Sequence, residues 1–148
     1  MFPRVHGANL ERRSFILPDG FEGDHNLILI AFTREQQFEI DTWIPAARRL
    51  ACDRTGFRYY ELPTISRSIP FARLWLDGAM RAGISDRAAR EATITLYLDK
   101  RAFRDALQLP SEETIYALLV DRAGHVLWRA GGVLTEEKEQ ALQRALDE

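Results

Sequence analysis

The segment from Leu27 to Leu50, LILIAFTREQQFEIDTWIPAARRL, decides the fold of this chain. It begins with an uninterrupted apolar run, which is typical of a central strand covered on both faces. The spacing then becomes helical from about Phe38, since five apolar residues can share one face: Phe38, Trp43, Ala46, Ala47 and Leu50. Pro45 lies inside this helix and should kink it. A strand that passes directly into a helix predicts an α/β architecture.

The rest of the chain continues this alternation. A strand with a Pro-Asp-Gly turn precedes the segment, and a second strand begins after Gly56 and should end at Pro63. An amphipathic helix over 68–83, a strand over 92–100 and a short helix over 101–109 follow. A hairpin over 114–132 and a final helix over 136–146 close the chain. This order predicts a mixed sheet with helices on both faces.

Two of these elements carry more detailed expectations. In the strand over 92–100, alternation places Ile94, Leu96 and Leu98 on one face, and the threonines of the other face should be wetter. The helix over 68–83 carries Trp75 on an apolar stripe. That stripe packs either on the sheet or on a partner, including a second copy of the chain in a homodimer.

Composition limits the function. The 148 residues are 46% hydrophobic and 28% charged, which predicts a single domain over 1–148 with a poorly ordered lead over 1–13. The net charge is −2 with both signs interspersed, so nucleic acid is not an expected partner. No window has the ~20 apolar residues needed to cross a bilayer. We therefore expect an intracellular, cytoplasmic protein without membrane insertion.

The sequence predicts no metal site and no cofactor. Cys52 is the only cysteine, which excludes an intramolecular disulfide and a zinc site built on several thiolates. The three histidines are scattered, and none has a second ligand at a typical metal-binding spacing. No phosphate-binding glycine-rich loop or ordered serine, histidine and aspartate set is present.

Several motifs resemble the thioredoxin-fold superfamily, in the branch that contains peroxiredoxins and thiol-disulfide oxidoreductases. FILPDGFEG (15–23) is similar to that branch's opening Phe-x-Leu-Pro-Asp-x-x-Gly. TITLYLDKRAFRDALQL (93–109) is similar to its inserted strand and helix, and YALLVDRAGHVLW (116–128) to its closing hairpin. The resemblance implies a thioredoxin-like three-layer sandwich, with a mixed central sheet, helices on both faces, and a C-terminal hairpin followed by a helix.

The resemblance also assigns the family's reactive positions in this chain. The family's first helix carries a proline five residues after the second cysteine of C-x-x-C, and Pro45 therefore places the two cysteine positions on Gln37 and Ile40. The cis-proline that faces the cysteines maps to Ile115. Glu35, Glu39 and Asp41 surround the helix end and would disfavour a thiolate there. The resemblance thus implies a redox-inactive member of the fold.

A narrower resemblance concerns the last two-thirds of the chain. GAMRAGI (78–84), the hairpin and TEEKEQALQRAL (135–146) look like the mitochondrial ATP-synthase assembly factor family, a thioredoxin-fold relative without C-x-x-C. This resemblance implies a role in assembly.

Two further residues have competing interpretations. Cys52 lies near the end of the first helix, where a helix dipole disfavours a thiolate, so we expect a small semi-buried core residue and not a nucleophile. Trp43 is either a recognition aromatic or a core residue, and its position favours the core.

The sequence therefore predicts a binding, chaperone or assembly module with a protein or peptide partner. The predicted contact groove contains six residues: Arg34, Gln36, Gln37, Ile40, Thr114 and Ile115. The fold usually holds extended peptide at this place through backbone contacts, which require no cysteine. The alternative is an atypical single-cysteine thiol peroxidase or oxidoreductase that uses Cys52.

Overall fold

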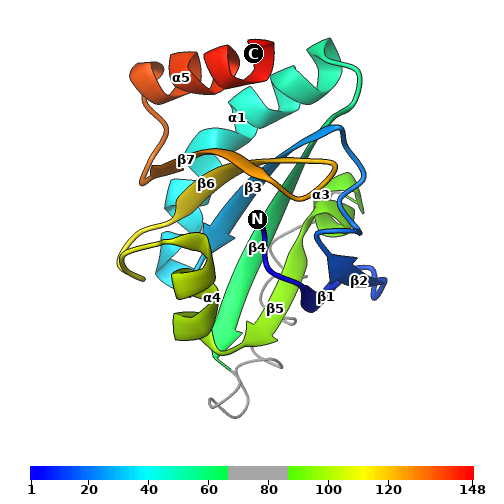
Figure 1. Ribbon diagram of the computed structural model, residues 1–148, viewed down its shortest axis with the longest axis vertical. Helices are drawn as coiled ribbons and strands as arrows, with labels where there is room; N and C mark the ends of the chain where they lie inside the picture. The colour runs from blue at the N-terminus through cyan, green and yellow to red at the C-terminus, as the bar shows by residue number, and fades with distance from the viewer. Residues whose placement is uncertain (67–86) are drawn as a thin grey trace.

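The computed structural model describes residues 1–66 and 87–148. Within these ranges the strands form one seven-stranded sheet in the order β2-β1-β5-β4-β3-β6-β7 (Figure 1). The strands are β1 (Val5–Asn9), β2 (Ser14–Leu17), β3 (His25–Ala31), β4 (Phe57–Ser66), β5 (Ile94–Leu98), β6 (Tyr116–Asp121) and β7 (Val126–Gly131). The helices are η1 (Arg34–Gln36), α1 (Gln37–Asp53), α3 (Arg87–Ala92), α4 (Lys100–Leu107) and α5 (Glu136–Asp147).

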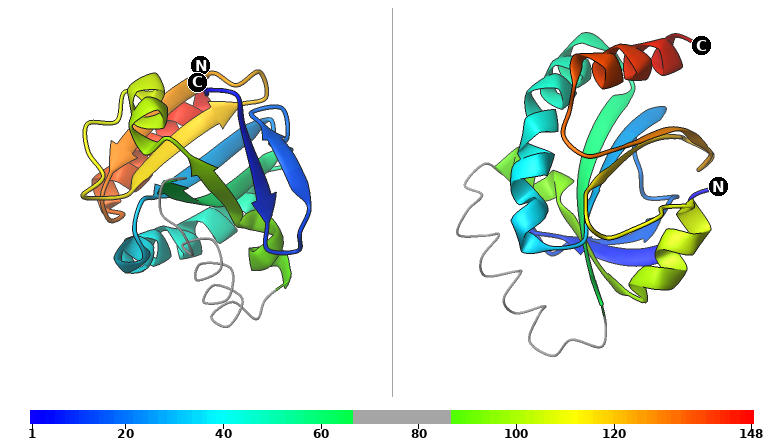
Figure 2. Two further views of the ribbon diagram at one scale, coloured as in Figure 1. Left: turned by 90° about the horizontal axis from the view of Figure 1, so that it is seen from below. Right: turned by 90° about the vertical axis from the view of Figure 1, so that its left-hand side faces the viewer.

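The sheet is mixed, as the sequence predicts. β3 lies at its centre, parallel to β4 and antiparallel to β6. Helices α1 and α5 cover one face and α4 covers the other, which produces three layers (Figure 2). The α/β sandwich with a C-terminal hairpin and helix is therefore confirmed. The helix expected over 68–83, with Trp75, falls on residues 67–86, outside the described part of the chain.

The apolar run of β3 supplies both cores because successive side chains point to opposite faces. Ile28 and Ile30 belong to the core beneath α4, together with Phe103. Leu27 and Leu29 belong to the core beneath α1 and α5. All four β3 side chains are buried, which explains why this strand shows no polar alternation in the sequence.

The N-terminal residues are part of the sheet, so the poorly ordered lead over 1–13 was a wrong expectation. β1 lies between β2 and β5 and pairs with both. Gly7 allows β1 to approach β5 closely, because a Cβ there would lie 2.7 Å from a methyl carbon of Ile94. Phe2 is buried against the rings of Phe21 and Phe103 at centroid distances of 5.3 and 5.8 Å.

Two expectations about strands also need correction. β4 continues through Pro63 to Ser66, and Pro63 is the last residue that β4 pairs with β3. Proline has no backbone N–H to donate, and here that lack affects only the last position of the β3–β4 pairing. The pairing of β4 with β5 starts at the next residue, Thr64. The face of β5 that was expected to be more exposed to solvent carries buried threonines, since Thr93 and Thr95 are both buried.

The inward face of α1 differs from the expected one at its first turn. Phe38 is 65% exposed, whereas Ile40 is buried beside Trp43 and Ala47. At 3.6 residues per turn, a residue five positions before Trp43 points well away from it, whereas one three positions before shares its face. The aromatic at the start of α1 is therefore on the surface.

No helix in the ranges 1–66 and 87–148 has the length and apolarity needed to cross a lipid bilayer. The longest of the helices described above is α1, with 17 residues, and it carries charged side chains along its length.

The burial of Trp43 predicts a large effect on stability. Its side chain is fully buried, and its indole Nε1 donates a hydrogen bond of 3.0 Å to the carbonyl oxygen of Gly132. Trp43→Ala should therefore lower the free energy of unfolding by ~3–5 kcal/mol, measured by urea denaturation. The matched control is Leu127→Ala, because Leu127 is 46% exposed and should change stability by less than ~0.5 kcal/mol. Equal stability of Trp43→Ala and wild type would contradict the core assignment.

Candidate functional site

The turn between β3 and α1 is closed by the side chain of Gln36. Its amide oxygen accepts hydrogen bonds from the backbone N–H groups of Phe32 (2.7 Å) and Thr33 (3.3 Å). Its amide nitrogen donates to the carbonyl oxygen of Glu112 at 2.6 Å. Gln36 is 5% exposed, so these bonds satisfy a buried amide and join the turn to the loop before β6. Gln36 is therefore a buried residue that links two segments of the chain, which corrects its predicted role in an open groove.

Gln37 occupies the first of the two positions assigned to cysteine. Its amide nitrogen donates to Glu61 Oε1 at 3.1 Å and to Asp41 Oδ1 at 3.0 Å. Glu61 is 7% exposed, and its burial raises the pKa of its carboxyl above the ordinary value. The hydrogen bond from Gln37 lowers this pKa, the charge of Asp41 raises it, and Arg48 lowers it. The start of α1 thus carries a polar amide that is bonded to a buried carboxyl group.

Ile40 and Ile115 lie together in the interior. Both belong to the core beneath α1 and α5, with exposed fractions of 1% and 0%. This burial corrects their predicted place in the contact groove, because their side chains contact the core and not a partner. Within the described ranges the cis peptide bond is Leu17–Pro18, and the bond before Ile115 is trans.

Thr114 contacts the start of α1. Its hydroxyl donates to Glu39 Oε2 at 2.6 Å, and both side chains are partly exposed. Arg34, one turn before Phe38, is exposed on η1. Of the predicted groove residues, the structure therefore leaves Arg34, Gln37 and Thr114 accessible, whereas Gln36, Ile40 and Ile115 are buried.

The segment after β7 also packs against the start of α1. Gly132 accepts the indole hydrogen bond from Trp43 and adopts a φ of +82°, a conformation that favours glycine. The backbone N–H of Leu134 donates to Thr42 Oγ1 at 3.0 Å. Lys138 Nζ then donates to the carbonyl oxygens of Gly131 and Val133 at 2.6 and 2.8 Å. These bonds fix the segment 131–134 beside α1.

Three segments thus form one surface, which we name the α1 rim and define by Phe38, Glu39, Thr42, Thr114 and Val133. Phe38 and Val133 are 65% and 39% exposed. Thr42 lies one helical turn after Phe38, and the backbone beside Val133 is bonded to it. The α1 rim therefore exposes two apolar side chains, and hydrogen bonds hold its three segments together.

Cys52 is exposed in the last turn of α1, which corrects the expectation of a core residue. Fifteen residues separate it from Gln37, which corresponds to ~22 Å along an α-helix. Its thiol is thus at the opposite end of α1 from the α1 rim. Among the described residues, no group of three or more histidine, cysteine, aspartate or glutamate side chains could share a metal ion.

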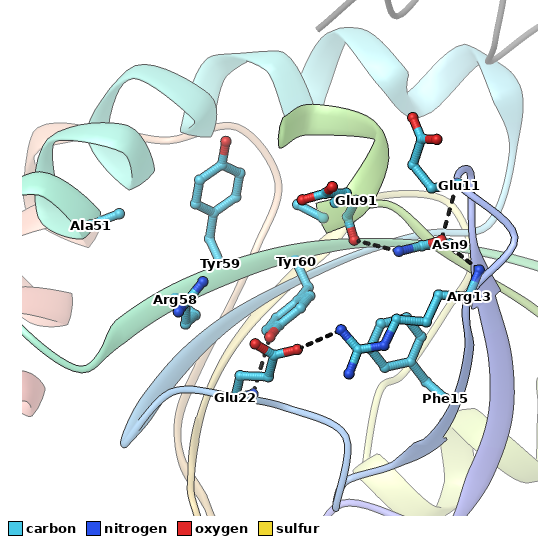
Figure 3. Close-up of a pocket in the computed structure, with 11 residues that line it drawn as sticks. Asn9, Glu11, Arg13, Phe15, Glu22, Ala51, Arg58, Tyr59, Tyr60 and Glu91 are labelled. Atoms are coloured by element: carbon cyan, nitrogen blue, oxygen red, sulfur yellow. Dashed lines mark hydrogen bonds and ion pairs between the residues drawn. The ribbon is translucent and has the colours of Figure 1, made fainter. Parts of the chain in front are cut away.

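A separate pocket of about 500 Å³ opens between the start of β4, α3 and the loop after β1 (Figure 3). Two of its charged side chains are bonded to each other. Arg13 forms an ion pair of 3.0 Å with Glu22 and lies over the ring of Phe15. The hydroxyl of Tyr60 accepts the backbone N–H of Glu22, and burial raises the pKa of Tyr60. This pocket therefore leaves fewer polar groups free to bind a ligand than its residue types suggest.

Comparisons with known proteins show the fold but no family. No protein-family model matches the chain, and no curated protein matches it either. Among solved structures, the chain is similar to an exposed lipoprotein thioredoxin from Streptococcus pneumoniae, with 11% identity, a TM-score of 0.62, and coverage of 99% of this chain and 100% of that chain. It is also similar to a thiol:disulfide interchange protein from Bacteroides sp., with 15% identity, a TM-score of 0.59, and coverage of 99% and 88%.

A third similar structure is yeast Sco1 with copper bound, with 12% identity, a TM-score of 0.62, and coverage of 99% of this chain and 92% of that chain. At these identities the likeness concerns the fold. The chain has a thioredoxin-like fold, as the sequence motifs imply.

Sequence reasoning missed three residues of the site. Glu61 was placed in a strand without a role, although a charged residue in an apolar run is a usable signal of a buried, partnered carboxyl. The sequence places Phe38 in the core only if the apolar face of the helix is taken to be wider than it is. No sequence pattern indicates that Val133 belongs to the site, because its place beside α1 depends on the tertiary packing of the segment after β7.

The buried carboxyl of Glu61 predicts a pH-dependent stability. Because its pKa in the folded state is raised above 4.5, the protonated form stabilises the fold. This stabilisation is fully present below that value and is lost as the pH rises through the pKa of the folded state. Glu61→Gln keeps an oxygen that can accept the hydrogen bond from Gln37 and should be more stable than wild type at neutral pH. The difference should shrink as the pH falls towards 4.

The measurement is urea denaturation of both proteins at a series of pH values. Glu35→Gln is the matched control, because Glu35 is exposed and should show no such pH-dependent difference from wild type. Parallel stability curves for wild type and Glu61→Gln would contradict the assignment of Glu61 as a buried, destabilising carboxylate.

Proposed function

We propose that this chain is a redox-inactive, thioredoxin-like binding module that holds a protein partner at the α1 rim. The observation that carries the proposal is the 65% exposure of Phe38 at the N-terminal end of α1. Large aromatic side chains are enriched among the residues that dominate binding energy at protein interfaces. Phe38 also follows directly after Gln37, at the place where the related fold contacts its substrates.

The frame around Phe38 supports a binding role. Gln36 joins the turn to Glu112, and Thr114 is bonded to Glu39, so the first turn of α1 is held from two sides. A contact surface that is already ordered loses little conformational entropy on binding. An adaptor, chaperone or assembly function would use such a surface.

The absence of cysteine at the fold's reactive positions supports the redox-inactive part of the proposal. A dithiol that forms an intramolecular disulfide needs two cysteines, and this chain carries only Cys52. The carboxylates of Glu35, Glu39 and Asp41 would also disfavour a thiolate at the start of α1. The narrower assembly-factor resemblance, a cytoplasmic location and self-association remain predictions.

The exposed thiol of Cys52 favours one alternative, a single-cysteine thiol peroxidase or oxidoreductase. We expect neither peroxide consumption nor reduction of insulin disulfides above background, for wild type and for Cys52→Ser alike. Cys52→Ser is a matched variant because the side chain is exposed and similar in size. Turnover by wild type that Cys52→Ser lacks would replace the binding proposal with the enzyme alternative.

The binding proposal predicts that Phe38→Ala loses partners without loss of stability. Affinity capture from a cell lysate, with wild type and variants as baits, should recover proteins that Phe38→Ala fails to retain. The expected loss of binding energy is at least ~2 kcal/mol for an aromatic anchor. Leu127→Ala is the matched control, since it also removes an exposed apolar side chain but lies on β7 outside the α1 rim. Identical proteins captured by all three baits would contradict the proposal.

A further inference from the structure

The partner's chemistry can be inferred from the charges around the α1 rim. Phe38 is flanked by Glu35 three residues before it and Asp41 three residues after it, positions that are neighbours on a helix surface. Glu39 follows Phe38 directly, and Glu113 lies next to Thr114, the residue bonded to Glu39. Four carboxylates therefore lie on the segments that form the α1 rim.

Within residues 1–66 and 87–148, Glu35, Glu39, Asp41 and Glu113 form no salt bridge. Glu39 and Asp41 accept hydrogen bonds only from the uncharged Thr114 and Gln37.

The neighbouring carboxylate of Glu112 shows the contrast. It is paired with Lys100 and Arg104 at 3.1 and 3.0 Å, which uses the two cations of α4 closest to this loop. Arg49 on α1 and Arg54, directly after α1, pair with carboxylates of α5. Glu35, Glu39, Asp41 and Glu113 thus differ from Glu112 in having no ion-pair partner among the described residues.

The remaining local charges do not cancel this negative potential. Arg34 is the one cation in the segment 34–41. Lys138, whose Nζ is bonded to the carbonyl oxygens of Gly131 and Val133, is a second cation beside the α1 rim, so the four carboxylates leave two negative charges. The N-terminal end of a helix contributes roughly half a positive charge, which is far less. Glu136 and Glu137, both exposed in the first turn of α5, extend the acidic surface beyond Val133.

We propose that the α1 rim binds a basic protein segment, in which an apolar side chain packs on Phe38 and Val133 and flanking lysine or arginine side chains face these carboxylates. The inference rests on the proposed function and adds the class of partner. Opposite charges across an interface raise the association rate and reject partners of like charge. Because the charges are exposed, binding should weaken as salt is added, since ions screen charges over ~10 Å at 0.1 M.

The test is selection from a random 12-residue peptide library displayed on phage, with the full chain as bait. The selected peptides should combine an apolar residue with at least two lysines or arginines. A synthetic copy of one such peptide should bind Phe38→Ala at least ~10-fold more weakly than wild type. Its affinity for wild type should fall at least ~10-fold between 50 and 500 mM salt. Leu127→Ala should bind like wild type.

Charge variants separate the two proposals. The double variant Glu35→Lys, Glu113→Lys should lose the basic peptides, whereas Asp53→Lys, Glu148→Lys, with the same change in net charge at the other end of α1 and at the C-terminus, should keep them. Peptides that depend on Phe38 but are neutral or acidic, with affinity independent of salt, would overturn the basic partner and leave the proposed function intact. A selection without any peptide that depends on Phe38 would overturn both.

Discussion

The buried amide of Gln36 is the contact on which the candidate site depends. The end of β3 leaves the backbone N–H groups of Phe32 and Thr33 without partners in a strand ladder, and the oxygen of Gln36 accepts both. Its nitrogen reaches across to the carbonyl oxygen of Glu112. A buried donor or acceptor without a partner costs ~1–3 kcal/mol, so the loss of this one side chain would strongly disfavour the closed turn. Lys100 supports the same closure, because its Nζ is bonded to the carbonyl oxygen of Phe32 and to Glu112. The position and order of the first turn of α1 follow from it.

The start of α1, to which the sequence resemblance assigns the reactive positions of the thioredoxin fold, carries polar contacts in this chain. Gln37 is bonded to the buried Glu61, and Ile40 fills the core between α1 and the sheet. A helix N-terminus favours negative charge, and here glutamate and aspartate side chains supply that charge. The N-terminal end of α1 is an ordered, acidic surface with an exposed aromatic ring.

The sequence predicts the fold well because both of its main signals are local. The apolar run of β3 and the amphipathic pattern of α5 need no tertiary information, and both lie where the pattern places them. The errors concern residues whose environment depends on distant parts of the chain. Gln36 is polar and sits in a turn, so only the approach of the loop at Glu112 reveals that it is buried. Ile115 is assigned to a groove by analogy with a proline, and its burial follows from α1 and α5 covering β6.

The turn before α1 is thus a rigid frame closed by Gln36 and not a mobile loop. Amide hydrogen exchange at Phe32, measured by NMR, tests this rigidity. We expect this amide to exchange as slowly as those of β3, and Gln36→Ala to accelerate it by at least ~10-fold while Ile28 stays protected. Exchange of the Phe32 amide in wild type at the rate of an exposed loop would show that the turn is mobile.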